Sequence, residues 1–153
     1  MLNPSTHCPI SLKLTIGADP EDFRKASLQL NQFAQDNGIP DEQLYRLDLC
    51  LNEVLANILE HGGKSAFSES ICLQFNVSRD SEYCEAVITV SDAGKQFDFM
   101  QVEQKPEPKH LDDAQPGGLG LLMLRRFTDK LKYCYEEGRN QLVLSFRWAE
   151  TAK

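Results

Sequence analysis

The hydrophobic period changes once along the first half of the chain, from that of a strand to that of a helix. Residues 11–16 alternate between polar and apolar side chains, which predicts a half-buried strand. Apolar residues then recur at helical spacing, and Asp19 followed by Pro20 is a typical start of a helix. The pattern therefore predicts one helix that ends at Asn37 and a second helix that runs to Gly62.

The second half predicts two pairs of strands separated by an irregular stretch. Residues 71–77 alternate cleanly, whereas residues 83–91 alternate less cleanly, which predicts a strand buried on both faces. Residues 100–116 contain three prolines and many charges, as expected of a functional lid or a disordered loop. A helix over 119–131 and a closing hairpin over 133–148 complete the pattern.

The predicted elements follow the order β-α-α-β-β-lid-α-β-β, with strands in adjacent runs. This order favours an α/β two-layer sandwich, in which three main helices cover one face of a mixed sheet of about five strands. A chain of 153 residues suits one domain, which we expect at residues 11–148 with a lid at about 100–116. Residues 1–10 and 149–153 are expected to be flexible tails.

Composition limits the kinds of binding partner and the cellular compartment that we expect for the protein. The formal net charge of −7 repels phosphate backbones, so direct binding of nucleic acid is disfavoured. The five cysteines are odd in number and include no C-x-x-C pair, which disfavours disulfides and zinc and indicates a reducing compartment. No apolar run approaches the length of a membrane helix, and no signal peptide is visible. We therefore expect a cytoplasmic protein with no membrane partner.

Three polar residues share one side of the second predicted helix. Glu53, Asn57 and His61 are spaced four apart, so they stack beside the apolar face, where the wall of a cleft would lie. The amide oxygen of Asn57 suits magnesium, and the carboxylate of Glu53 is suited to accept a proton from a hydroxyl nucleophile. The alternative is that all three are ordinary residues of a solvated helix surface.

Asp92 and Gly94 stand at the end of the predicted strand 83–91. A carboxylate at a strand end can accept the exocyclic amine of adenine, and a nearby glycine lets a flat base approach the backbone. The alternative is an ordinary transition from strand to turn, because Asp and Gly are common turn residues.

Three glycines in four residues, Gly117, Gly118 and Gly120, open the last predicted helix. Glycines let backbone N–H groups approach phosphate oxygens, and the N-terminus of a helix attracts anions. The motif does not follow a strand and lacks G-K-[ST], so it is neither a dinucleotide fingerprint nor a Walker loop. The alternative is a flexible hinge before a helix.

Taken in this order, the three motifs resemble those of the Bergerat (GHKL) superfamily of ATP-binding proteins. The asparagine box, the first glycine box and the second glycine box are matched by Glu53-x-x-x-Asn57-x-x-x-His61-Gly62, Asp92-x-Gly94 and Gly118-Leu119-Gly120-Leu121. Within the superfamily the chain is most similar to the small serine/threonine kinases that act as anti-sigma factors. The resemblance covers residues 11–148.

The resemblance implies an ATP and magnesium site in an α/β sandwich. It implies that Asn57 is the magnesium ligand, that Glu53 is the general base, and that Asp92 recognises the adenine amine. The residues that it assigns to nucleotide binding are Asn57, His61, Asp92, Gly94, Gly118, Leu119, Gly120 and Leu121.

The resemblance further implies a kinase that holds a sigma factor away from RNA polymerase and phosphorylates a serine of an antagonist protein. Such kinases are often homodimers, and this chain is a candidate for the same state. Two positions depart from the family pattern. Pro116 replaces a basic residue, for which Lys105, Lys109 and Lys95 are candidate substitutes, and Gln96 replaces a glycine. The alternative function is a non-catalytic module that binds ATP and sequesters a partner.

Overall fold

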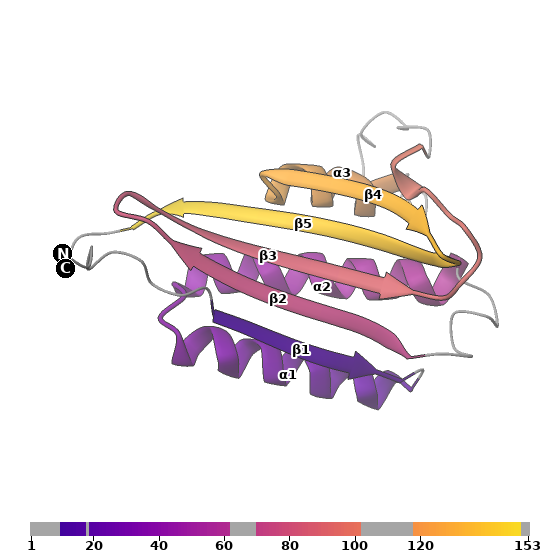
Figure 1. Ribbon diagram of the computed structural model, residues 1–153, viewed down its shortest axis with the longest axis horizontal. Helices are drawn as coiled ribbons and strands as arrows, with labels where there is room; N and C mark the ends of the chain where they lie inside the picture. The colour runs from indigo at the N-terminus through magenta and orange to yellow at the C-terminus, as the bar shows by residue number, and fades with distance from the viewer. Residues whose placement is uncertain (1–9, 18, 62–69, 102–117, 151–153) are drawn as a thin grey trace.

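The computed structural model describes residues 10–17, 19–61, 70–101 and 118–150 (Figure 1). Of the expected tails and lid, this part of the chain includes only residues 10, 100, 101, 149 and 150; the rest of these segments lies outside the described residues. The elements, in chain order, are β1 (Ile10–Ile16), α1 (Pro20–Asp36), α2 (Asp41–His61), β2 (Ile71–Arg79), β3 (Tyr83–Asp92), η2 (Phe99–Gln101), α3 (Gly118–Phe127), β4 (Lys130–Glu136) and β5 (Arg139–Ala149).

The five strands form one sheet in the order β1-β2-β3-β5-β4, and each of the four pairings is antiparallel (Figure 1). The two-layer fold is confirmed, but the expected mixed sheet is wrong. Two successive helices between β1 and β2 return the chain antiparallel, and the β2–β3 and β4–β5 turns do the same. The single helix α3 gives β4 the direction of β3, but β5 lies between them, so no parallel pair forms.

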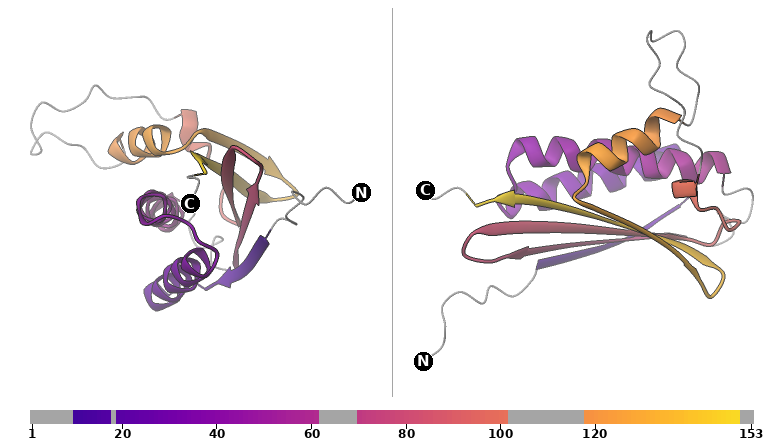
Figure 2. Two further views of the ribbon diagram at one scale, coloured as in Figure 1. Left: turned by 90° about the vertical axis from the view of Figure 1, so that its left-hand side faces the viewer. Right: turned by 90° about the horizontal axis from the view of Figure 1, so that it is seen from above.

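The three α-helices cover one face of the sheet, and no described element covers the other face (Figure 2). Successive residues of β2 and β3 therefore alternate between buried and more exposed positions. The expectation that β3 is buried on both faces is wrong, because only its helix-facing residues are buried. No helix in the described ranges is long and apolar enough to cross a membrane.

Phe75 lies in the core between the sheet and the helices. It is fully buried, its register partners are Leu12 of β1 and Ile88 of β3, and its ring meets Phe33 of α1 edge-on with 5.6 Å between centroids. The buried residues of α2 are Leu44, Leu47, Cys50, Leu51, Val54, Leu55 and Ile58. This apolar stripe fixes α2 against the sheet and thereby fixes the polar side chains that flank it.

Local sequence signals predicted the start of α1 correctly but not the end of α3. Asp19 caps α1, since its Oδ1 accepts the backbone N–H of Glu21 at 3.1 Å, as the sequence predicted. The helix expected over 119–131 instead ends at Phe127. The backbone N–H of Asp129 donates to the carbonyl of Ser145 at 2.8 Å, and β4 then pairs with β5, so pairing with a distant strand ends the helix.

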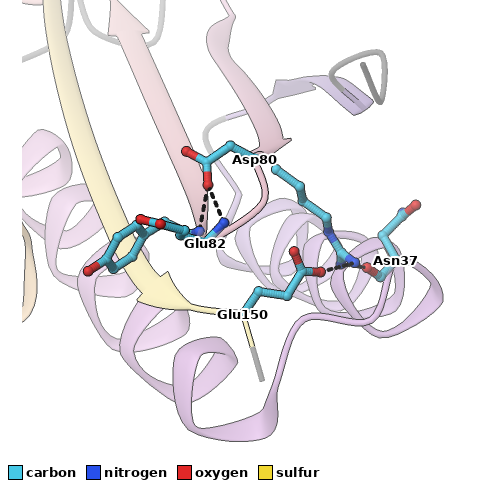
Figure 3. Close-up of polar contacts among 6 residues, drawn as sticks. Asn37, Asp80, Glu82 and Glu150 are labelled. Atoms are coloured by element: carbon cyan, nitrogen blue, oxygen red, sulfur yellow. Dashed lines mark hydrogen bonds and ion pairs between the residues drawn. The ribbon is translucent and has the colours of Figure 1, made fainter. Parts of the chain in front are cut away.

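A polar cluster fixes the end of the sheet at which β2 turns into β3 (Figure 3). Asp80 accepts the backbone N–H groups of Glu82 and Tyr83 at 2.8 and 2.6 Å, which closes this turn. The guanidinium of Arg79 donates to the carbonyl of Asn37 at the end of α1 and lies 3.5 Å from the carboxylate of Glu150. Asp92 lies at the opposite end of β3.

Candidate nucleotide-binding site

A pocket lies between α2 and the end of β3, and it encloses about 460 Å³ of space when its open mouth is counted. Its walls combine apolar side chains with a few polar groups: Val54, Asn57, Ile58, His61, Val90, Asp92, Lys95, Phe97, Tyr133, Asn140 and Leu142. The structure thus brings Asn57, His61 and Asp92 together around one pocket.

Asn57 and His61 reach the pocket because they flank the buried stripe of α2. Both side chains are half-buried, and the neighbouring Val54 and Ile58 are buried in the core. The ring of His61 stacks on the ring of Phe97, with 4.3 Å between centroids and 15° between planes. This stack joins the end of α2 to the segment after β3 and gives the pocket an aromatic wall.

Asp92 is the last residue of β3 and is only 6% exposed. Its Oδ1 accepts the backbone N–H of Gly94 at 2.9 Å and the side-chain amide of Asn140 at 3.2 Å. Both hydrogen bonds converge on one carboxylate oxygen, so Oδ2 can accept a hydrogen bond from a ligand in the pocket. A carboxylate held in this way suits recognition of an amine.

Glu53 shares its side of α2 with Asn57 but is not among the residues that line the pocket. It lies against α3, because a methyl group placed on Gly120 would be 1.8 Å from Glu53 Oε1 and 3.0 Å from its Cγ. Partial burial raises the pKa of the Glu53 carboxyl, and the charge of Glu60 raises that pKa further. A carboxyl with a raised pKa is a better proton acceptor than an ordinary glutamate once it is ionised.

The second glycine motif begins α3 beside Glu53. Gly120 is buried, and Leu121 is buried within the core, so the side chain of Leu121 holds α3 in place. Gly118 is the first residue of α3, with Leu119 following it. The N–H groups in the first turn of a helix have no partners within the helix and can bind an anion.

A Gly120→Ala substitution is expected to displace the side chain of Glu53 and leave the fold intact. The added methyl group overlaps a flexible side chain and not backbone, and alanine favours a helix over glycine by about 1 kcal/mol. Because partial burial raises the Glu53 pKa, displacement into solvent should lower that pKa toward its ordinary value. Carboxyl ¹³C titration by NMR measures this shift; an unchanged Glu53 pKa would contradict the contact.

Three pocket residues have roles that sequence reasoning did not assign: Asn140, Tyr133 and Phe97. Asn140 is a polar residue at an inward position of β5, where the next inward residues are Leu142 and Leu144. That break in an apolar face is the signal that identifies it. Lys95, a candidate substitute for the basic residue that Pro116 replaces, also lines the pocket.

The donor set of the pocket fits magnesium only together with a phosphate ligand. The described residues contain no group of three or more His, Cys, Asp or Glu side chains arranged to hold a metal. Magnesium, however, needs only one or two protein oxygens when phosphates and waters supply the rest. The half-buried amide of Asn57 on the pocket wall can supply one such oxygen.

A pocket with apolar and aromatic walls and a few convergent polar groups is typical of a small-molecule site. Residues 16–146 match the family described as the histidine kinase-like ATPase domain, and the chain belongs to this family. The expected resemblance to Bergerat-type ATP-binding proteins is therefore confirmed.

Two curated relatives are protein kinases. The chain is 35% identical over 101 residues to the serine/threonine-protein kinase BtrW of Bordetella bronchiseptica, covering 66% of this chain and 68% of BtrW. It is 29% identical over 144 residues to the serine-protein kinase RsbW of Listeria innocua, covering 92% of this chain and 88% of RsbW.

Two solved structures have the same fold. One holds the RsbU and RsbW domains of Rv1364c from Mycobacterium tuberculosis, with a TM-score of 0.63 and 15% identity over 94% of this chain. The match spans 34% of that longer chain, about a third of its length. The other is the SiaB–SiaC complex from Pseudomonas aeruginosa, with a TM-score of 0.61 and 14% identity over 88% of each chain.

Proposed function

We propose that the protein is an ATP-dependent serine/threonine protein kinase that acts as an anti-sigma regulatory factor in a partner-switching system. The observation that carries this proposal is the convergence of Asn57, His61 and Asp92 on one pocket, with Glu53 on the same side of α2. The names of the relatives BtrW and RsbW, both protein kinases, support the same activity.

In the proposed mechanism, Asp92 accepts a hydrogen bond from the exocyclic amine of adenine, and the base lies beside the stacked rings of His61 and Phe97. Gly94 lies beneath the base, and the first turn of α3, with Gly118, Leu119, Gly120 and Leu121, faces the phosphates. Asn57 would hold a magnesium ion, which neutralises phosphate charge when bound.

Glu53 acts in the proposed mechanism as the general base for a serine hydroxyl of the protein substrate. The serine oxygen forms a bond to the γ-phosphorus of ATP, and the bond from that phosphorus to the β–γ bridging oxygen breaks. The hydroxyl proton passes to the Glu53 carboxylate, and ADP leaves. Positioning and charge neutralisation carry most of the rate enhancement in such a reaction.

The proposed partners are a sigma factor and an antagonist protein that carries the phosphorylated serine. The fold is shared with SiaB, whose structure was solved in complex with SiaC, and this supports a protein-binding role for the fold. We expect the protein in the cytoplasm, and a homodimer is the expected assembly by analogy with the family.

Calorimetric titration with ATP, with and without magnesium, tests the nucleotide site directly. We expect ATP to bind and magnesium to tighten the binding. An Asn57→Ala variant should bind ATP with no tightening by magnesium. Absence of ATP binding to the wild-type protein would overturn the kinase proposal, and wild-type magnesium dependence in Asn57→Ala would overturn the assignment of the ligand.

Asp92→Asn is expected to weaken ATP binding by about 10- to 150-fold, because a charge-assisted hydrogen bond is worth roughly 1.5–3 kcal/mol. The new amide can keep the Oδ1 contacts to Gly94 and Asn140, but its NH₂ group would face the adenine amine. Inosine triphosphate carries a carbonyl in place of that amine, so it should bind more tightly to the Asp92→Asn variant than to the wild-type protein. Calorimetry with both nucleotides checks this; unchanged ATP affinity would contradict the adenine assignment.

A further inference from the structure

Asn140 is a buried amide at the junction of three strands and the segment that follows β3. It is 8% exposed, and its register partners are Asp92 of β3 and Tyr135 of β4. It faces inward on a strand whose other inward residues are apolar. A buried amide costs free energy unless its donors and acceptor are paired, so its contacts decide whether it has a role.

Every polar atom of the Asn140 side chain is paired. Nδ2 donates to Asp92 Oδ1 at 3.2 Å and to the backbone carbonyls of Gly94 and Lys95 at 3.2 and 3.0 Å. Oδ1 accepts the backbone N–H of Phe97 at 3.1 Å and the hydroxyl of Tyr133. Three acceptors surround the nitrogen and two donors surround the oxygen, so only one orientation of the amide satisfies the site.

These contacts hold both parts of the pocket that would touch a base. The bond to Asp92 holds the carboxylate through its Oδ1. The bond from the Phe97 N–H fixes the backbone of the residue whose ring stacks on His61. The segment from Gly94 to Phe97 belongs to no strand or helix, so three of its backbone groups depend on this single side chain.

We propose that Asn140 is a positioning residue that sets the preference of the pocket for adenine. It does so by holding Asp92 and the Phe97 backbone in one fixed geometry, with its own polar atoms already paired. This inference rests on the proposed binding of ATP at Asp92, and it adds a residue that controls base selectivity through others. A residue that merely fills the core would have no effect on the choice between two bases.

The test compares the affinities for ATP and inosine triphosphate in the wild-type protein and in Asn140→Leu. Leucine has the same branched heavy-atom skeleton and suits the apolar surroundings, but it removes every hydrogen bond of the amide. We expect the wild type to prefer ATP by about tenfold or more, and we expect the variant to lose most of that preference. Thermal melting and circular dichroism establish that the variant is folded.

Gln141→Met is the matched control. Gln141 is the next residue of β5, points to the open face of the sheet, and its described side-chain contact is with Cys134. The change also removes a side-chain amide, here at similar volume, and the preference for ATP should stay at the wild-type value.

Tyr133→Phe keeps the inference testable if Asn140→Leu does not fold. It removes one donor to Asn140 Oδ1 and should lower the preference for ATP by about threefold. If a folded Asn140→Leu protein keeps the wild-type preference for ATP, this inference alone is overturned. If only Tyr133→Phe folds, an unchanged preference in that variant overturns it in the same way. A wild-type protein that binds neither nucleotide would overturn the proposed function, and this inference with it.

Discussion

Glu53→Gln is expected to lower phosphoryl transfer to the protein substrate by about 10²- to 10⁴-fold, the usual contribution of a general base. Glutamine keeps the shape of the side chain against Gly120 but cannot take the hydroxyl proton. ATP affinity should be unchanged, because Glu53 does not line the described pocket. Transfer of radiolabelled γ-phosphate measures the first effect, and calorimetry measures the second.

Glu60→Gln is the matched control for this prediction. Glu60 lies seven residues further along α2, is exposed, and influences Glu53 only through its charge. Its replacement should lower the Glu53 pKa slightly and leave the rate nearly unchanged. If Glu53→Gln retains wild-type transfer, Glu53 is not the base. If the wild type itself transfers no phosphate but binds ATP, the non-catalytic sequestering module becomes the better account.

The raised pKa of Glu53 also makes the effect of Glu53→Gln on stability depend on pH. Because the folded-state pKa lies above the unfolded value, the folded protein favours the protonated carboxyl. Its contribution to stability is present at low pH and is lost as pH rises through the folded pKa. Glu53→Gln should therefore raise the melting temperature at pH 7.5 and have little effect near pH 4. A lower melting temperature at pH 7.5 would contradict the burial of the charge.

Local sequence patterns predicted the order of the elements because period and capping depend on near neighbours. The alternation at 71–77 identified β2, and the spacing of Glu53, Asn57 and His61 placed all three on one side of α2. The antiparallel sheet was not predicted, because strand neighbours are set by long-range pairing. Asp92 and Asn140, for example, are register partners although they stand 48 residues apart.

The same limit applies to the candidate site. Helical spacing placed Glu53 beside Asn57, but it carried no information on where α3 would pack. In the structure, Gly120 of α3 contacts Glu53, so this side chain lies between two helices while Asn57 faces the pocket. The contacts of Asn140 could not be predicted from the sequence either, because they join a strand to a segment without regular structure. The motif residues could therefore be proposed from the sequence, whereas Asn140, which hydrogen-bonds to Asp92, could not.

Phe75→Ala is expected to lower the free energy of unfolding by about 3–5 kcal/mol, the usual cost of deleting a buried phenyl ring. Phe75 is 0% exposed, and the substitution also removes the edge-on contact with Phe33. The melting temperature should fall by roughly 2–4 °C for each kcal/mol in a chain of this size. Chemical denaturation of the two proteins measures the difference.

Gln74→Ala is the control for this prediction, because Gln74 precedes Phe75 on β2 and faces the open side of the sheet. Its replacement should change stability by no more than about 0.5 kcal/mol. Below its melting temperature, Phe75→Ala should still bind ATP, because Phe75 is not among the residues that line the pocket. Equal losses of stability in Phe75→Ala and Gln74→Ala would contradict the conclusion that the core lies on only one face of the sheet. Loss of ATP binding in a folded Phe75→Ala protein would mean that the core and the pocket are energetically coupled through β2 and β3.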